Sequence, residues 1–141
     1  APQGVYSLEE LADDAIALLD TLGIDKVHFV GLSMGGMIGQ CLALQHTKRL
    51  SSLALCDTAA IMPEQTQPIW QNRIDEALSK GITGQVEETL KRWFTAPYLE
   101  KKTRWAERIR EQFIQTHVDG YVGCCEAIRR LNYLEEKRNI Q

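Results

Sequence analysis

A serine stands between glycines in the stretch GLSMGG, which begins at Gly31. A serine hydroxyl becomes a useful nucleophile when a base accepts its proton, and Gly-x-Ser-x-Gly is the spacing of a nucleophile elbow. In such an elbow the serine sits at a sharp strand-to-helix turn, where side chains two positions before and two positions after it would collide. Gly31 and Gly35 occupy these two positions, and Gly36 follows. The pattern predicts Ser33 as a catalytic nucleophile.

The residue after the serine supplies the next part of this chemistry. A helix that begins at Met34 would point its free N–H groups and the positive end of its dipole at the reacting centre. The backbone N–H of Met34 is therefore the expected donor of an oxyanion hole. Two other interpretations exist: a phosphate-binding loop, which would need glycine in place of Ser33, and a structural turn with an idle serine.

The chain has three histidines, and none is positioned by its sequence as the general base. His28 lies on the incoming strand at an odd offset from Ser33, so we expect it on the opposite face, buried and hydrogen-bonded. His46 is expected at the far end of the next helix, and His117 in a surface connection between two late helices.

One carboxylate is a candidate for the acid of a catalytic triad, in which an acid orients the base that activates the serine. Asp57 follows the strand after the elbow, which would bring it to the same edge of a parallel sheet as Ser33. The alternative interpretation is a turn residue that hydrogen-bonds its own loop. The sequence thus offers a nucleophile and half an oxyanion hole, with Asp57 as an alternative acid and no base.

The elements that must position these residues are an alternation of helices and strands. Ser7 and Glu10 form a capping box for a helix that Gly23 ends. Apolar runs predict buried strands over 26–32 and 50–56, with a helix over 34–46 between them. This order implies right-handed crossovers and a parallel sheet, so the predicted class is α/β.

The second half of the chain is expected to be helical. Helices are predicted over about 68–79, 85–94, 101–115 and 118–131, with Pro97 as an interruption. Thr116 with Asp119 resembles an N-cap for the last of them. The predicted partition is an α/β region over 1–60 and an all-helical region over 61–141.

Composition narrows the class of protein. The 141 residues are 44% hydrophobic and 25% charged, with a net charge of −3. These values fit a globular protein and give no electrostatic reason to expect nucleic acid or a membrane as partner. No apolar run approaches the roughly 20 residues that span a bilayer.

The spacing and neighbours of the four cysteines indicate the redox compartment and whether a metal site is expected. Cys41, Cys56, Cys124 and Cys125 lack the spacing of a zinc site. Each has apolar neighbours, so we expect reduced thiols that pack as small hydrophobic groups, no metal, and a cytoplasmic protein.

Several longer stretches carry a family resemblance. They are YSLEELADDAIALLDTLGI, VHFVGLSMGGMIGQCLAL, LSSLALCDTAA, KRWFTAPY and DGYVGCCEAIRRL. With them the chain resembles the α/β-hydrolase family, and within it the 3-oxoadipate enol-lactonases, over nearly its whole length. The resemblance implies a partial α/β-hydrolase core with a nucleophile elbow, followed by a helical cap.

The resemblance also implies an activity and its parts. Ser33 would attack an enol-lactone in the catabolism of aromatic compounds, Met34 would donate to the oxyanion, and no cofactor would be needed. The usual base and acid have no counterpart in this chain, which resembles an internal piece of the family. The substrate's carboxylate would meet a cation of the cap, for which Arg92, Arg129 and Arg130 are candidates, with Trp93 as a wall.

Two alternatives stay open. One keeps the elbow and changes the substrate, giving a carboxylesterase or a carbon–carbon bond hydrolase of the same fold. The other is a catalytically silent, truncated protein whose uncovered sheet drives oligomerisation. The expected partners are accordingly a small lactone or ester, and either another copy or the remainder of a longer chain.

Overall fold

The computed structural model describes residues 1–135. Over this part the chain divides into two compact units. The sheet unit contains residues 5–67 and 126–135, and the helical unit contains residues 1–4 and 68–125. The sequence predicted a boundary near residue 60 with only helices after it. The structure instead returns residues 126–135 to the sheet unit, and residues 136–141 of the expected cap lie outside the described part.

The sheet unit begins with α1 (Leu8–Thr21). The predicted capping box is confirmed: Ser7 Oγ accepts from the backbone N–H of Glu10, and the Glu10 carboxylate accepts from the Ser7 N–H. β1 (Val27–Leu32), α2 (Met34–Gln45) and β2 (Leu50–Cys56) follow in the predicted order. A 3₁₀ turn (Thr47–Arg49) joins α2 to β2.

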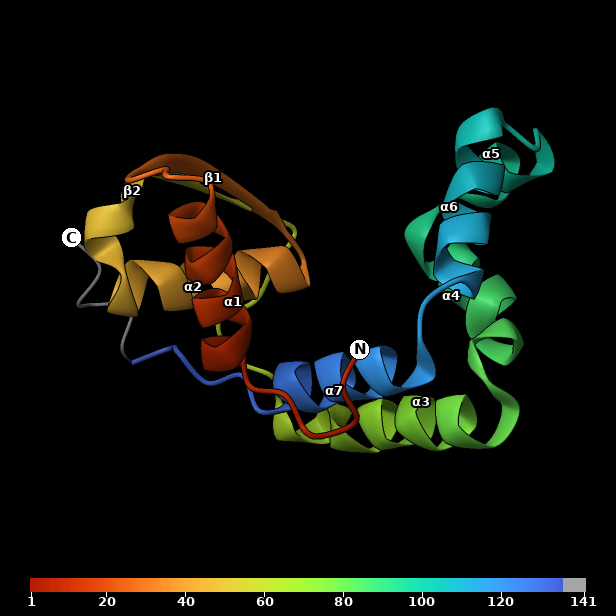
Figure 1. Cartoon of the computed structure of the whole chain (residues 1–141). Coiled ribbons are helices and arrows are strands. Elements are labelled where there is room, and N and C mark those ends of the chain that lie inside the picture. The colour runs from red at the N-terminus through yellow and green to blue at the C-terminus, as the bar shows by residue number, and fades with distance from the viewer. Residues whose placement is uncertain (136–141) are drawn as a thin grey trace. The chain divides into compact units, whose positions relative to one another are not determined.

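The two strands pair in parallel, as predicted, with His28 opposite Ser52 and Leu32 opposite Cys56. Figure 1 shows α1 and α2 on the same side of these strands. Phe29 and Leu53 face α2, because a Cβ added to Gly39 of that helix would lie within about 3 Å of both side chains. One face of the sheet is therefore covered.

The other face of the sheet corrects the prediction of buried strands. Val30 and Leu32 are 71% and 66% exposed, and His28 is exposed as well. Side chains alternate along a strand, so these residues point away from α2, and no helix of the sheet unit covers them among its described residues. His28 does make the expected hydrogen bond, 2.8 Å from Nδ1 to Ser52 Oγ.

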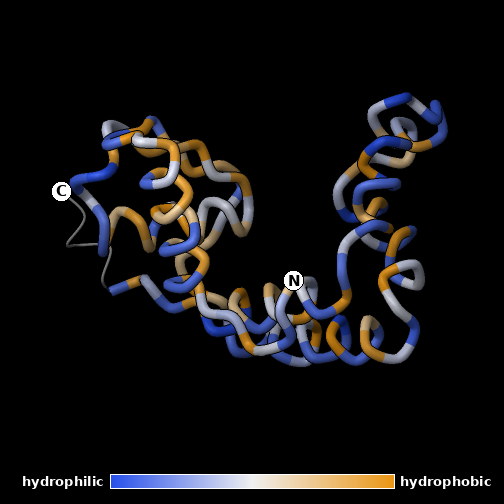
Figure 2. Tube along the Cα trace, viewed as in Figure 1, coloured by the Kyte–Doolittle hydropathy of each residue, from blue (hydrophilic) through white to orange (hydrophobic). Residues whose placement is uncertain are grey.

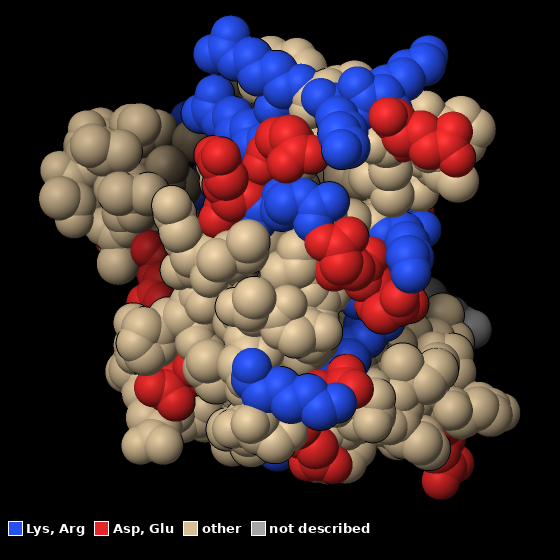
Figure 3. Space-filling view, turned by 90° about the vertical axis from the view of Figure 1, so that its right-hand side faces the viewer, with Lys and Arg blue, Asp and Glu red and all other residues tan. Residues whose placement is uncertain are grey.

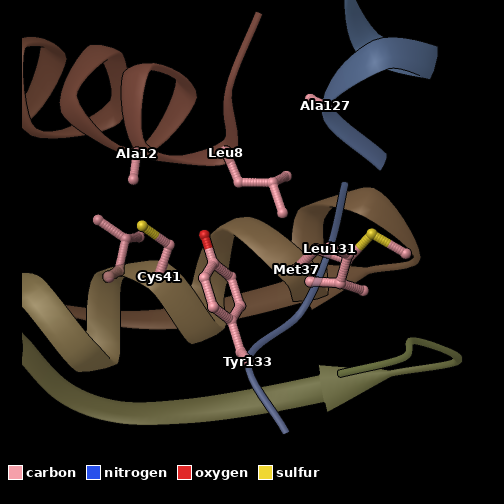
Figure 4. Close-up of a cluster of buried hydrophobic side chains, with 8 residues drawn as sticks. Leu8, Ala12, Met37, Cys41, Ala127, Leu131 and Tyr133 are labelled. Atoms are coloured by element: carbon pink, nitrogen blue, oxygen red, sulfur yellow. The ribbon is translucent and has the colours of Figure 1, made fainter. Parts of the chain in front are cut away.

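The core of the sheet unit lies between its helices and the end of the described chain (Figure 4). Its buried members are Leu8, Ala12, Met37, Cys41, Leu42, Ala127, Leu131 and Tyr133. The Tyr133 hydroxyl donates to Glu9 Oε1 at 2.5 Å. The Tyr133 N–H donates to the carbonyl of Ala60 at 2.7 Å, which ties residues 131–133 to the segment after β2.

The helical unit contains the predicted helices, with shifts of a few residues at their ends. They are α3 (Gln67–Lys80), α4 (Val86–Trp93), α6 (Arg104–Ile114) and α7 (Val118–Arg129), of which the end of α7 belongs to the sheet unit. The sequence missed α5 (Ala96–Glu100), because Pro97 near a helix start is favourable and does not interrupt. Thr103 caps α6, whereas the Thr116 hydroxyl donates back to the Gln112 carbonyl.

This unit has a core of its own, formed by Ala77, Ile82, Val86, Leu90 and Phe113. Figure 2 shows apolar and polar residues alternating along its helices, as amphipathic packing requires. On the face shown in Figure 3, acidic side chains lie among the basic ones. Across the described residues, no helix is both long and apolar enough to span a membrane.

Candidate functional site

Ser33 lies at a strained junction between β1 and α2. Its φ of 52° and ψ of −115° are unusual for a residue with a side chain. Two contacts hold this conformation: the Ser33 N–H donates to the Cys56 carbonyl at 2.9 Å, and the Ser33 carbonyl accepts from Thr58 Oγ1 at 2.7 Å. The extended segment, sharp turn and helix predicted for a nucleophile elbow are all present.

The glycines around the turn have different roles. A Cβ on Gly31 would lie 2.2 Å from the Gly35 carbonyl oxygen, and a Cβ on Gly36 would lie 2.7 Å from Thr58. Gly31 excludes a side chain because the backbone of the turn comes back against it, and Gly36 excludes one because the Thr58 side chain packs there. A Cβ on Gly35 would meet no atom within 4 Å, so the expectation that Gly35 must be small for steric reasons is wrong.

The first backbone N–H groups of α2 differ in whether they have an acceptor. The Ser33 carbonyl accepts from the N–H groups of Gly36 and Met37, at 2.9 and 3.2 Å. Among residues 1–135 the Met34 N–H has no backbone acceptor, as is usual in a first helical turn. Ser33 is exposed, and its hydroxyl makes no capping hydrogen bond. An exposed hydroxyl therefore lies beside the positive end of a helix.

The three histidines have partners other than Ser33. His28 bonds Ser52, and His46 Nε2 lies 2.9 Å from Asp13 Oδ1. His117 Nδ1 lies 3.5 Å from Asp119 Oδ2 and is exposed. Within the described part of the chain, therefore, each histidine is engaged elsewhere.

Asp57 comes directly after β2, in the left-handed region with φ 42°. Its side chain is exposed, and no ion pair joins it to a histidine among the residues described. A positive φ at an aspartate is typical of a turn. Its role as an alternative acid remains a prediction.

The residues predicted to bind substrate have other contacts. Trp93 is 56% exposed and packs edge-to-face on Phe113, with ring centroids 5.7 Å apart. Arg129 Nε and Arg130 Nη2 both reach Glu126 Oε2, at 2.9 and 3.2 Å. The two arginines thus share the single negative charge of Glu126.

Arg92 differs from this pair, because its guanidinium donates to Thr89 Oγ1 at 2.7 Å and has no acidic partner within ion-pair distance among residues 1–135. The structure does not test the substrate-binding roles of Trp93, Arg92, Arg129 or Arg130, which stay predictions.

Two residues that support the elbow were missed. Thr58 binds the Ser33 carbonyl and packs over Gly36, although it lies 25 positions from Ser33 in sequence. Gln40 is fully buried on α2, and its Nε2 donates to the Ala59 carbonyl at 2.7 Å. A buried glutamine in an otherwise apolar helix was the available signal for Gln40, whereas nothing in the sequence distinguishes Thr58.

All four cysteines are free, as expected. Cys41 and Cys125 are buried, and burial raises the pKa of the half-buried Cys124 thiol. Cys56 is exposed on the uncovered side of β2, so the expectation that it packs as a small hydrophobic group is wrong. No group of three or more His, Cys, Asp or Glu side chains within residues 1–135 is arranged to hold a metal ion.

Comparisons with known proteins agree with this geometry. A family model described as the alpha/beta hydrolase fold matches residues 1–113. The 3-oxoadipate enol-lactonase 2 of Acinetobacter baylyi is 35% identical over 139 residues, which are 99% of this chain and 51% of that protein.

Two solved structures of hydrolases are also similar to this chain over its whole length. The enol-lactonase from Burkholderia xenovorans superposes with a TM-score of 0.93 at 38% identity, over 100% of this chain and 54% of its own. A hydrolase from Pseudomonas aeruginosa also gives 0.93, at 32% identity, over 100% of this chain and 53% of its own. The chain spans about half the length of these relatives.

Proposed function

Because this chain belongs to the α/β-hydrolase family, we propose that it is the part of a serine hydrolase that carries the nucleophile, and that the substrate is an enol-lactone of the 3-oxoadipate type. The observation that carries the proposal is the backbone of Ser33, held at φ 52° between β1 and α2. The relatives named as enol-lactonases support the choice of substrate class.

Ser33 and Met34 each have one role in the proposed reaction. Ser33 Oγ attacks the lactone carbonyl carbon, while a base takes its proton. The N–H of Met34 donates to the oxyanion that forms, and the oxyanion then collapses as the ring C–O bond breaks. The base returns its proton to the enol oxygen as that oxygen leaves, and the enol then tautomerises to a ketone. Water next attacks the acyl-enzyme, which releases the acid and restores the Ser33 hydroxyl.

This sequence of steps needs a base from outside residues 1–135, because the described histidines bind Ser52, Asp13 and Asp119. The orienting acid is either Asp57 or a residue from outside the same range. The experiment therefore supplies the other half from a relative. A chimera carries this chain in place of the 54% of the Burkholderia xenovorans enol-lactonase that it matches. Hydrolysis of the enol-lactone is compared with hydrolysis of a simple aryl ester.

We expect the chimera to prefer the enol-lactone, and Ser33→Ala to lower its kcat by roughly 10³-fold or more. Ser51→Ala is the matched control, because Ser51 is an exposed serine of β2, and it should leave kcat unchanged. A preference for the aryl ester would favour a carboxylesterase, and cleavage of a carbon–carbon bond in a further substrate would favour a carbon–carbon bond hydrolase. Full activity in Ser33→Ala would refute the serine mechanism.

A catalytically silent protein that oligomerises is the competing account. The exposed side chains of Val30 and Leu32 support it, because parallel sheets are normally covered on both faces. A silent protein would predict a chimera that folds and yet hydrolyses neither substrate. In the hydrolase account the same face is covered by the remainder of a longer polypeptide or by another copy.

A further inference from the structure

Basic side chains surround an exposed tryptophan where α5 is joined to α6. All five side chains of this cluster are exposed, with Trp105 at 60%. We call the cluster the basic tip, and it consists of Lys101, Lys102, Arg104, Trp105 and Arg108. Figure 1 shows α5 and the start of α6 at the end of the helical unit that lies away from α3 and α7, and Figure 3 shows basic side chains along this end.

The four cations of the basic tip form no ion pair within the described residues, whereas Arg110 of the same helix forms two. The guanidinium groups of Arg104 and Arg108 instead lie over the Trp105 ring, 6.0 and 5.9 Å from its centroid. Residues 100–111 contain five cations and three acids, although the whole chain has a net charge of −3. The overall charge therefore hides a local positive excess.

Two residues of the basic tip occupy positions that cost stability. Lys102 has a φ of 46°, a conformation that suits glycine or asparagine better than lysine. Arg104 is the first residue of α6, where the positive end of the helix dipole disfavours a cation. Neither side chain recovers this cost through an ion pair within the described part of the chain, which points to a partner outside it.

The acidic side chains nearby leave the basic tip positive. Glu107 Oε2 lies 3.4 Å from Arg110 Nε, so it is engaged with the next cation along α6. Glu100 ends α5 before the tip, and Glu111 lies about one helical turn beyond Arg108. These acids border the tip, and their repulsion restricts contact with an anionic partner to the tip itself.

We propose that the basic tip binds an anionic lipid surface, with the Trp105 ring among the headgroups and the cations on lipid phosphates. Tryptophan favours the interface between water and lipid, and each lysine or arginine near an anionic membrane adds attraction. A projecting end with an exposed ring fits a flat surface. Single-stranded nucleic acid would instead need a groove and a free ring face for its bases, whereas guanidinium groups lie over this ring.

The test is flotation of the 141-residue chain with lipid vesicles. We expect binding to vesicles of phosphatidylcholine mixed with phosphatidylglycerol and none to phosphatidylcholine alone, and high salt should release the chain. Loss of any one cation of the tip should weaken binding about fivefold, because each contributes similarly near the surface. The variants are Lys101→Gln, Lys102→Gln, Arg104→Gln and Arg108→Gln, whereas Arg104→Lys keeps the charge and should retain the binding.

Fluorescence tests the place of the tryptophan. Anionic vesicles with brominated lipid chains should quench the tryptophan fluorescence of the chain. Trp105→Phe should abolish this quenching. Trp93→Phe is the matched control, because Trp93 is also exposed on the helical unit, and it should keep the quenching.

Lys80→Gln is the control for net charge, since Lys80 pairs with Glu76 at the end of α3. Ser33→Ala should bind normally, which separates this proposal from the proposed hydrolytic function. Binding through the uncovered apolar face of the sheet would need no anionic lipid. The proposal is overturned if anionic vesicles do not bind, if neutral vesicles bind equally well, if oligothymidylate binds in their place, or if Lys80→Gln weakens binding as much as Arg104→Gln does.

Discussion

The two units of this chain position polar groups by different means. In the sheet unit a backbone turn sets the place of Ser33, with glycines where a Cβ would collide. In the helical unit the polar side chain of Gln85 is held by separate helices, because it donates to the Arg73 carbonyl on α3 and accepts from the Tyr121 hydroxyl on α7. A site made by a backbone turn leaves a compact sequence motif, whereas a site made by tertiary packing leaves none.

The largest effect is expected in the core of the helical unit. Leu90 is 1% exposed on α4, so Leu90→Ala should lower the free energy of unfolding by about 2–5 kcal/mol, since it removes apolar contacts and leaves a cavity. Leu78→Ala is the control. Leu78 is 61% exposed, so this substitution should change the free energy of unfolding by less than about 0.5 kcal/mol. Urea titration measures both, and equal losses would show that this unit lacks a tightly packed core.

The next effect tests the elbow in the sheet unit. Gly31→Ala places a Cβ against the Gly35 carbonyl and should cost about 1–3 kcal/mol of stability, because backbone must move. Gly35→Ala meets open space and should be neutral or stabilising by up to about 1 kcal/mol, since alanine favours helix. Urea titration compares the pair. A larger loss in Gly35→Ala would contradict the geometry of the turn.

A smaller effect is expected at the residue that holds the elbow from the neighbouring strand end. Thr58→Val keeps the shape of the side chain and removes its hydrogen bond to the Ser33 carbonyl, which should cost about 1 kcal/mol. In the chimera the same change should lower kcat, because Ser33 would lose a contact that fixes its backbone. Thr66→Val serves as control, since Thr66 bonds the Pro63 carbonyl in an exposed turn. A kcat lowered equally by both changes would argue against a specific role for Thr58.

The smallest effect appears only at high pH, in the helical unit. The pKa of Tyr121 is raised to about 12 by burial, above its ordinary value of 10.0. Because the folded chain favours the neutral phenol, the stability that Tyr121 contributes is fully present below pH 10 and is lost as the pH rises towards 12. Ultraviolet titration should show two tyrosines that ionise late, because burial and the hydrogen bond to Glu9 also raise the pKa of Tyr133. Tyr121→Phe should remove one of the two, and a late absorbance change of undiminished size in Tyr121→Phe would contradict the assignment.

The sequence predicted most of the sheet unit because its signals are local. The capping box at Ser7, the apolar strand before Gly31 and the glycines around Ser33 each lie within a few positions of what they determine. The prediction that both strands are buried was wrong for a physical reason. A short apolar run indicates that a strand can be covered, but it does not show whether a neighbour is present to cover each face.

The rest of the candidate site depends on distant partners. Neither Thr58 beside Gly36 nor residues 131–133 beside the segment after β2 could be read from local patterns. The predicted substrate cations were chosen by charge alone. Two of them, Arg129 and Arg130, are paired with Glu126, an interaction at helical spacing that could have been noticed.

The most direct test of the account is where a fluorophosphonate reacts in the chimera. Peptide mass spectrometry should find the adduct on Ser33, and intact mass should show one label per chain and none in Ser33→Ala. This outcome is expected because only Ser33 combines an exposed hydroxyl with the strained turn and the start of α2 within the described residues. An adduct on another serine, or equal labelling of Ser33→Ala, would contradict the assignment of Ser33 as the nucleophile.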